Sequence, residues 1–335
     1  MPTASHAAYY ETNGPAEQVL RFGTIELPDP PPGEVLIELR AIGINPADVK
    51  RRTNVAPPAG RRLVPGDDGA GVIVAVGAGV SAARIGQRVW IYNGRLDRDV
   101  GTSASHTIQP AERAVPLPDG VSFEAGACLG VPAITAHYAL FVDGDIEGQT
   151  VLVHGGAGGV GTTAVQLAVW AGARVIATVS GPEKAAVASA CGAHHVLNYR
   201  TENIVERVRE ITGGQGVDRV VDVAFGVNLE TNLDVLKDNG IIATYSSDAQ
   251  PEPKIPFWRL LRKNIRVHYL IVYTLTRPTL RVAARDITSA LGAGALKPVI
   301  TRTMPLAELV DAHELVGRFT GIGNVVLLPH ADGIR

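Results

Sequence analysis

The central part of the chain alternates between short apolar runs and segments whose apolar positions recur at helical spacing. Turn residues such as glycine and proline bound the short runs, which is typical of buried strands. The expected strands are Thr150–His154, Arg174–Val179, Val196–Asn198, Val217–Val223 and Ile241–Tyr245, and the expected helices are 161–170, 182–192, 204–211 and 229–237. Strands that alternate with helices predict a parallel sheet with helices on both faces.

The first part of the chain, up to about Pro118, has a different pattern that predicts a β-rich region. Val35–Arg40 mixes apolar and charged positions as a half-buried strand does, and 71–77 is an apolar run between glycines. Near the C-terminus the alternation of strands and helices ends. The run Asn324–Leu328 predicts a last strand that returns to the β-rich region.

Composition narrows the class of protein. The 335 residues suit two domains, and 46% hydrophobic against 19% charged residues provides for buried cores. A formal net charge of -2, without a block of Lys or Arg, argues against a nucleic-acid surface. No run of about 18 apolar residues predicts a membrane span, and the first ten residues do not resemble a signal peptide. Cys128 and Cys191 are too few for a disulfide framework, so a cytoplasmic protein is expected.

A glycine-rich loop follows the first expected strand of the central region and opens a helix. Its spacing, Gly156-x-Gly158-x-x-Gly161, matches the dinucleotide fingerprint in the strand–loop–helix context that the fingerprint requires. Small residues allow the backbone to approach a pyrophosphate, and the helix N-terminus supplies N–H groups. The alternative is a tight turn without a ligand. The expected pyrophosphate-binding residues are Gly156, Ala157, Gly158, Gly159, Val160 and Gly161.

The segment after the second expected strand indicates which dinucleotide is bound. An NAD site usually has Asp or Glu about 20 residues after the glycine loop to bind the ribose 2′-hydroxyl. Here the strand ends at Val179, and the first acid is Glu183. Ser180 and Lys184, a hydroxyl and a cation that suit a 2′-phosphate, stand there instead, and Tyr199 offers a ring for adenine. NADPH is therefore expected, although Lys184 could also be an ordinary solvated residue.

Six segments carry a family resemblance. They are Gly43–Asp48, Pro65–Gly71, Val131–Ala136, Val151–Gly161, Leu197–Arg200 and Leu296–Ile300. Together and in this order they resemble the zinc-independent quinone oxidoreductases, the zeta-crystallin-like branch of the medium-chain dehydrogenase/reductase superfamily. The resemblance covers nearly the whole chain. It implies an α/β fold in which a Rossmann doubly wound parallel sheet, residues 123–297, is inserted in a GroES-like β-rich domain formed by residues 1–122 and 298–335.

The resemblance also implies a set of cofactor contacts. The pyrophosphate would lie on 157–161, and the 2′-phosphate end on Ser180, Lys184 and Tyr199. The residues implied near the nicotinamide are Asn45, Thr135, Tyr245, Ser246, Leu270, Ile271, Val272 and Asn324.

Three departures from the family pattern concern the substrate. Lys50 stands where many relatives have a tyrosine over the active-site cleft, and Asn324 stands where lysine is frequent. The segment 251–258 is richer in proline than the family pattern predicts. These departures leave the identity of the substrate open, while cofactor binding is unaffected.

The positions of the zinc ligands in related alcohol dehydrogenases argue against a metal. Zinc needs three or four Cys, His or carboxylate ligands. Asn45 stands at the first ligand position, Asp67 at the histidine position, and 133–136 supplies no cysteine at the third. Without zinc to polarise an ordinary ketone, hydride transfer favours acceptors that are already electrophilic. Asn45 and Lys50 are the candidate catalytic residues that would stabilise the developing negative charge. Lys50 could equally be an ordinary surface lysine in the basic run 50–52.

The sequence therefore predicts an NADPH-dependent quinone oxidoreductase, with a quinone or a conjugated carbonyl compound as its small-molecule substrate. A reductase of enone or alkenal double bonds shares every motif and is the alternative. A third possibility is an NADPH-binding structural or regulatory protein without activity. The run Val267–Val272, with Tyr269, could be an edge strand that pairs across a two-fold axis in a homodimer or homotetramer, or a buried internal strand.

Overall fold

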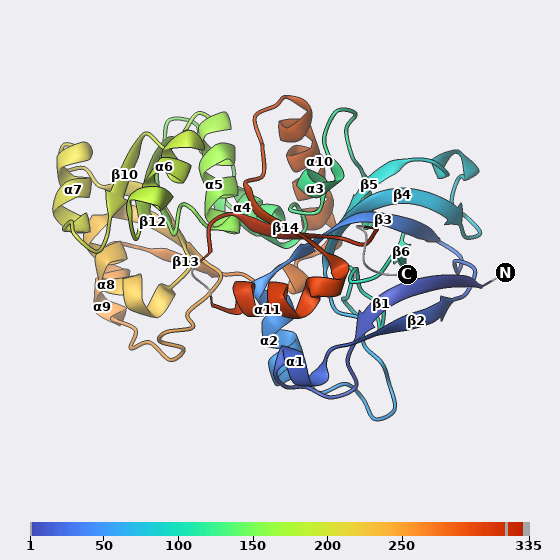
Figure 1. The fold of residues 1–335 in the computed structure, drawn as a ribbon. Coiled ribbons are helices and arrows are strands. Elements are labelled where there is room, and N and C mark those ends of the chain that lie inside the picture. The colour runs from blue at the N-terminus through green and yellow to red at the C-terminus, as the bar shows by residue number, and fades with distance from the viewer. Residues whose placement is uncertain (1, 319–320, 331–335) are drawn as a thin grey trace. The chain divides into compact units, whose positions relative to one another are not determined.

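The computed structural model describes residues 2–318 and 321–330. The chain divides into two compact units, one formed by Met1–Pro132 with Pro298–Arg335 and the other by Ala133–Lys297 (Figure 1). The first boundary lies inside helix α4 (Val131–Phe141), and the family resemblance implies a boundary after Ser122.

The second unit contains a six-stranded parallel sheet in the order β10-β9-β8-β11-β12-β13. Its strands are β8 (Thr150–His154), β9 (Arg174–Val179), β10 (His195–Asn198), β11 (Val217–Asp222), β12 (Leu236–Thr244) and β13 (Arg266–Tyr269). This is the strand order of a Rossmann fold, so the fold class is confirmed. Strand β13 lies at one edge, which decides between the two placements that the sequence left open, and it ends at Tyr269.

Helices flank this sheet, with α5 and α6 above it and α8 and α9 below it in the view of Figure 1. The helices of the second unit after α4 are α5 (Gly159–Trp170), α6 (Pro182–Ala190), α7 (Ile204–Ile211), α8 (Phe225–Val235), α9 (Phe257–Arg262), the 3₁₀ turn η2 (Val272–Thr274) and α10 (Arg277–Gly292). Apolar side chains from β8, β9 and β11 form the core with α7 and α8. None of the described helices is long and apolar enough to cross a membrane.

Helix α8 differs from the sequence prediction, which began it at residue 229 and ended it at 237. Its start depends on contacts from other elements, because the N–H of Phe225 donates to the carbonyl of Ser246 at 3.0 Å. The N–H of Gly226 donates to the hydroxyl of Ser247 at 2.9 Å. These caps come from the segment after β12, so local sequence could not indicate them. The helix ends where β12 begins, at Leu236.

The first unit is β-rich, as predicted. A seven-stranded sheet has the order β14-β15-β3-β4-β5-β7, with β6 paired to β3, and β1 and β2 form a separate antiparallel pair. The strands are β1 (Thr3–Tyr9), β2 (Arg21–Leu27), β3 (Glu34–Ile44), β4 (Asp68–Val76), β5 (Arg88–Ile91), β6 (His106–Pro110), β7 (Ala114–Pro116), β14 (Ile300–Pro305) and β15 (Asn324–Leu328). The helices are α1 (Ala16–Val19), α2 (Pro46–Asn54), α3 (Phe123–Gly126) and α11 (Leu309–Gly317), with 3₁₀ turns η1 (Ala82–Arg84) and η3 (Leu306–Glu308).

The return of the C-terminal segment to this unit is confirmed. In β15, Val325 pairs with Ile44 of β3 in an antiparallel register. Strand β14 pairs with β15 in parallel.

Candidate functional site

The glycine-rich loop joins β8 to α5 at the carboxyl end of the sheet. A Cβ on Gly161 would lie 2.1 Å from the carbonyl oxygen of Gly155, and one on Gly156 would lie 2.7 Å from the Cβ of Ala177. Both glycines are therefore required by packing, Gly161 within the loop and Gly156 against β9. A Cβ on Gly158 would meet only the carbonyl oxygen of Gly155, at 3.5 Å, so this position faces open space.

The N-terminus of α5 suits an anion. Gly158 is the N-cap residue and offers no side chain to the first N–H groups, and no acid stands in the first turn. Unpaired N–H groups and the positive end of the helix dipole attract phosphate oxygens. The open space at Gly158 and this helix end together fit the pyrophosphate of a dinucleotide.

A buried chain of hydrogen bonds lies under the loop and involves His154. Asn232 donates its amide N–H to Asp222 at 2.7 Å, so its oxygen accepts from Nε2 of His154 at 2.8 Å. In the tautomer with a single proton on Nε2, Nδ1 of His154 accepts from the Thr178 hydroxyl at 2.9 Å. Thr178 also accepts the N–H of Gly156 through its carbonyl oxygen at 3.0 Å. The chain of bonds holds one end of the loop against β9, which gives His154 a structural role.

Ser180 and Tyr199 follow the carboxyl ends of the next two strands, and Lys184 lies in the helix that begins after the first of these strands. Ser180 follows β9, and the N–H of Tyr199 donates to the carbonyl of Val179 at 3.1 Å, so the segment after β10 lies beside the end of β9. Lys184 is the third residue of α6. A cation there is opposed by the helix dipole, and a bound anion such as a 2′-phosphate would offset that cost.

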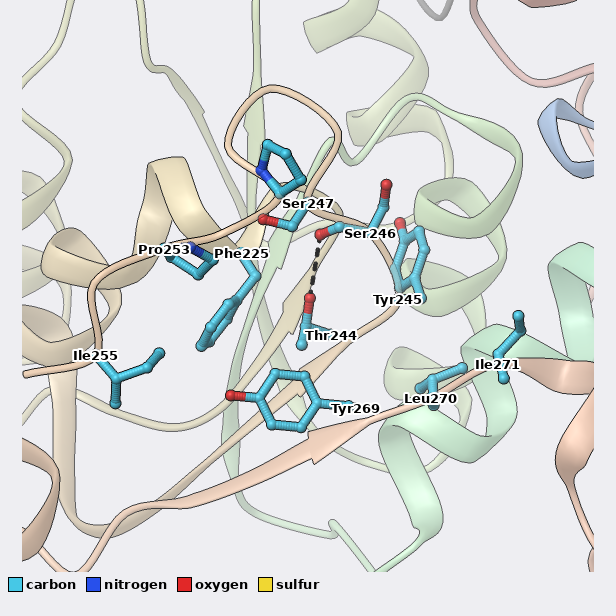
Figure 2. A pocket seen from close by; sticks show the side chains of 11 residues that line it. Phe225, Thr244, Tyr245, Ser246, Ser247, Pro253, Ile255, Tyr269, Leu270 and Ile271 are labelled. Carbon is cyan, nitrogen blue, oxygen red and sulfur yellow. Dashed lines mark hydrogen bonds between the residues drawn. The ribbon is translucent and has the colours of Figure 1, made fainter. Parts of the chain in front are cut away.

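A cavity of about 460 Å³ opens at the carboxyl ends of β12 and β13 (Figure 2). Four predicted nicotinamide contacts line it: Tyr245, Ser246, Leu270 and Ile271. Val272 begins the next 3₁₀ turn and is buried, and Thr135 is buried on α4. Burial and the nearby Asp222 carboxylate raise the pKa of Tyr245, so its hydroxyl keeps its proton.

The remaining predicted residues belong to the first unit. Asn45 caps α2 directly after β3, and Asn324 begins β15, whose next residue pairs with Ile44. The ends of neighbouring strands thus bring Asn45 and Asn324 together. The amide of Asn45 donates to Asp68 at 2.9 Å, and that of Asn324 donates to the carbonyl of Val299 at 2.9 Å. Lys50 is half-buried further along α2.

Three buried aspartates surround Asn45, and sequence reasoning identified Asp67 alone. Asp48 accepts the N–H of Asn45 at 2.8 Å, and burial together with the Asp67 carboxylate raises its pKa to about 7. Burial raises the pKa of Asp68 well above its ordinary value, although Asp68 accepts from Asn45. Asp67 pairs with Arg51 at 3.0 Å. Burial of these carboxyls arises where β3, β4 and α2 meet and leaves no local sequence pattern.

Two of the positions that bind zinc in related alcohol dehydrogenases carry an amide and a paired carboxylate in this chain. Within residues 2–318 and 321–330, no group of three or more His, Cys, Asp or Glu side chains is arranged to hold a metal ion. Asn45, at the position of the first zinc ligand in related alcohol dehydrogenases, carries a neutral amide. Asp67, at the position of their histidine ligand, forms an ion pair with Arg51.

Comparison with known proteins identifies both parts of the chain. Residues 31–119 match the family "Alcohol dehydrogenase GroES-like domain", and residues 159–289 match "Zinc-binding dehydrogenase". A quinone oxidoreductase of Pseudomonas aeruginosa is 33% identical over 93% of this chain and 96% of its own. A 2-haloacrylate reductase of a Burkholderia species is 32% identical over 97% of this chain and 99% of its own.

A solved structure agrees with this assignment. Escherichia coli quinone oxidoreductase complexed with NADPH has a TM-score of 0.84 and 31% identity, and the match covers 97% of this chain and 100% of that one. The chain therefore belongs to the quinone oxidoreductase branch of the medium-chain dehydrogenase/reductase superfamily.

Proposed function

We propose that this protein is an NADPH-dependent quinone oxidoreductase that works without zinc. The observation that carries the proposal is the glycine loop, whose open face at Gly158 lies over the N-terminus of α5. Lys184 near the end of β9 supports the choice of NADPH over NADH. The relatives named as quinone oxidoreductases, one of them complexed with NADPH, support the same activity.

We assign three parts of the cofactor to three groups of residues. The pyrophosphate lies on Gly156–Gly161, and the 2′-phosphate end on Ser180, Lys184 and Tyr199. The residues at the nicotinamide end are Asn45, Thr135, Tyr245, Ser246, Leu270, Ile271, Val272 and Asn324. The second-unit residues lie at or near the carboxyl ends of the parallel strands. This supports the assignment, because ligands of such sheets bind outside the carboxyl ends of the strands.

The donor set around Asn45 supports an acceptor that needs no Lewis acid. When bound, NADPH supplies a hydride, and with one proton from solvent it converts a quinone to a hydroquinone and leaves NADP⁺. Asn45 donates one amide N–H to Asp68, and its second N–H stabilises the developing oxyanion. The positive charge of Lys50 adds to that stabilisation. Asp67 cannot accept a metal in this role without losing its ion pair with Arg51.

A substrate screen tests the proposal. Purified protein should oxidise NADPH, followed by its absorbance, with members of a panel of ortho- and para-quinones. NADH should be used less well in the same assay. Failure of every quinone to oxidise NADPH would contradict the proposed activity, and tight NADPH binding without turnover on any acceptor would favour a non-enzymatic role.

Reduction of a conjugated double bond is the second candidate. It is favoured by the relative named 2-haloacrylate reductase, which matches 97% of this chain. The ratio of kcat/KM for quinones to that for conjugated enones separates the two activities. A ratio below one would make the double-bond reductase the better description.

The assembly and location of the protein are also proposals. The free edge of β13 supports a homodimer, and a homotetramer needs a further interface. Two free thiols, Cys128 and Cys191, are compatible with the reducing cytoplasm.

A further inference from the structure

The proline-rich segment that departs from the family pattern forms a wall of the cavity at β12 and β13. Pro251, Pro253 and Ile255 line the cavity beside Phe225 and Tyr269. Because proline fixes its own φ angle, this wall is largely preformed before a ligand arrives. A preformed wall lowers the conformational cost of binding.

The chemistry of the lining favours an uncharged ligand. None of the 11 described residues that line the cavity is charged. The rings of Phe225 and Tyr269 meet edge to face, with centroids 5.4 Å apart. A carboxylate entering this cavity would lose its hydration without gaining a cation, whereas a flat or aliphatic neutral group would bury apolar surface.

The threonine and serine hydroxyl groups of the lining are already engaged by the protein, and Ser246 donates to Asp248 at 2.9 Å. Thr244 donates to the carbonyl of Ser246 at 3.3 Å, and Ser247 donates to the carbonyl of Gln250 at 2.6 Å. These threonine and serine side chains therefore need no hydrogen bond from a ligand, and their part of the wall suits an uncharged group.

The cavity has two ends in Figure 2. Tyr245 and Leu270, assigned above to the nicotinamide, lie at one end, while Phe225 and Ile255 lie at the other, with Tyr269 between them. A group that extends from the nicotinamide end would reach the aromatic and proline-rich end.

We propose that this cavity binds the apolar substituent of a neutral quinone, and so selects lipophilic quinones over small anionic acrylates. The inference rests on the proposed function and specifies its substrate class. The relative named 2-haloacrylate reductase is named for a small conjugated acid, which is the class of acceptor that this uncharged lining disfavours.

A pair of acceptors tests the inference: a dimethoxy-methyl-benzoquinone without an alkyl chain, and the same ring with a four-carbon chain. In the unaltered protein the chain should raise kcat/KM at least about tenfold, the effect of burying about two methylenes. The variant Ile255→Ser should remove most of that preference. The ratio of the two values is insensitive to partial unfolding or to weaker NADPH binding, since both acceptors are affected equally.

Leu261→Ser is the matched control, because Leu261 is 53% exposed on the adjacent α9 and does not line the cavity. It should preserve the preference for the alkylated quinone. Three results would overturn the inference and leave the proposed function intact. They are equal kcat/KM for the two quinones, an unchanged ratio in Ile255→Ser, and faster turnover of 2-chloroacrylate than of either quinone. Absence of turnover on every quinone would instead overturn the proposed function, and the inference with it.

Discussion

At the scale of single residues, Lys184 tests the choice of cofactor. Its cation lies in the first turn of α6, where the helix dipole disfavours it. If it pairs with the 2′-phosphate, Lys184→Ala should raise the Kd for NADPH at least about tenfold and change the Kd for NADH little. Calorimetric titration with each cofactor measures both values. Arg209→Ala, an exposed cation on α7 of the same unit, is the control, and equal losses for NADPH and NADH would refute the assignment.

Asp48 gives a prediction about pH. Its folded-state pKa of about 7 lies above its ordinary value of 3.8, so between those values the folded protein binds the extra proton. The stability that this proton contributes is present at low pH and is lost as pH rises through about 7. The loss from this one group amounts to roughly 1 kcal/mol per pH unit within that window.

The variant Asp48→Asn removes this titration and keeps an oxygen that can accept the N–H of Asn45. The free energy of unfolding of the variant, minus that of the unaltered protein, should increase as pH rises from 5 to about 8. Urea unfolding at each pH measures both values. His313 acts oppositely, since burial lowers its pKa to about 3 and its contribution is lost as pH falls below about 6. The contribution of His313 is present in both proteins, so it cancels when the free energy of unfolding of the unaltered protein is subtracted from that of the variant. Asp119→Asn, at an exposed position, is the control, and parallel curves for Asp48→Asn would contradict the prediction.

At the scale of elements, two glycines of the loop have different expected roles: Gly161 in packing and Gly158 in ligand binding. Gly161→Ala places a Cβ 2.1 Å from a backbone oxygen and should destabilise the fold by about 1–3 kcal/mol. Gly158→Ala meets only ordinary contact at 3.5 Å and should cost less than about 1 kcal/mol of stability. Its methyl group, however, occupies the open face expected for the pyrophosphate, so the Kd for NADPH should rise at least about tenfold.

Thermal unfolding and NADPH titration of the same samples measure the two effects. Gly292→Ala, at an open position near the end of α10, is the glycine control and should leave the Kd for NADPH unchanged. Unaltered NADPH binding by Gly158→Ala would move the pyrophosphate away from this face of the loop.

Elements whose ends depend on their own sequence were predictable, and those whose ends depend on distant contacts were not. Strands β8 and β9 begin and end at the predicted residues, because their apolar runs are bounded by local turns. Helix α8 begins at Phe225, four residues before its predicted start at Leu229, because Ser246 and Ser247 cap it from the segment after β12.

The same distinction applies to the candidate site. The glycine spacing is a local pattern, and the structure has the predicted loop between β8 and α5. The burial of Asp48 and Asp68 around Asn45 depends on the meeting of β3, β4 and α2, which no spacing in the sequence encodes. The cavity at Pro251–Ile255 likewise depends on Tyr269 of β13, which comes later in the chain and lines the same cavity.

At the scale of the whole molecule, the edge of the parallel sheet predicts an assembly. Strand β13 ends the strand order of the second unit, and an uncovered edge strand is a template for pairing with another chain. Phe257 and Trp258, on the helix that precedes β13, are 59% and 65% exposed. Large exposed aromatic side chains beside an open edge favour an interface between two copies of the chain.

Light scattering coupled to size exclusion should therefore give twice the chain mass at micromolar concentration. Trp258→Lys adds a charge to this face and should raise the dimer dissociation constant at least about tenfold, the loss of one buried aromatic contact. Trp170→Lys is the matched control, since Trp170 is 44% exposed at the end of α5, and it should leave the mass unchanged. A monomer mass in the unaltered protein, or equal dissociation by both substitutions, would contradict an interface on this face. Four times the chain mass, reduced to half by Trp258→Lys, would instead indicate a homotetramer in which this edge forms one of two interfaces.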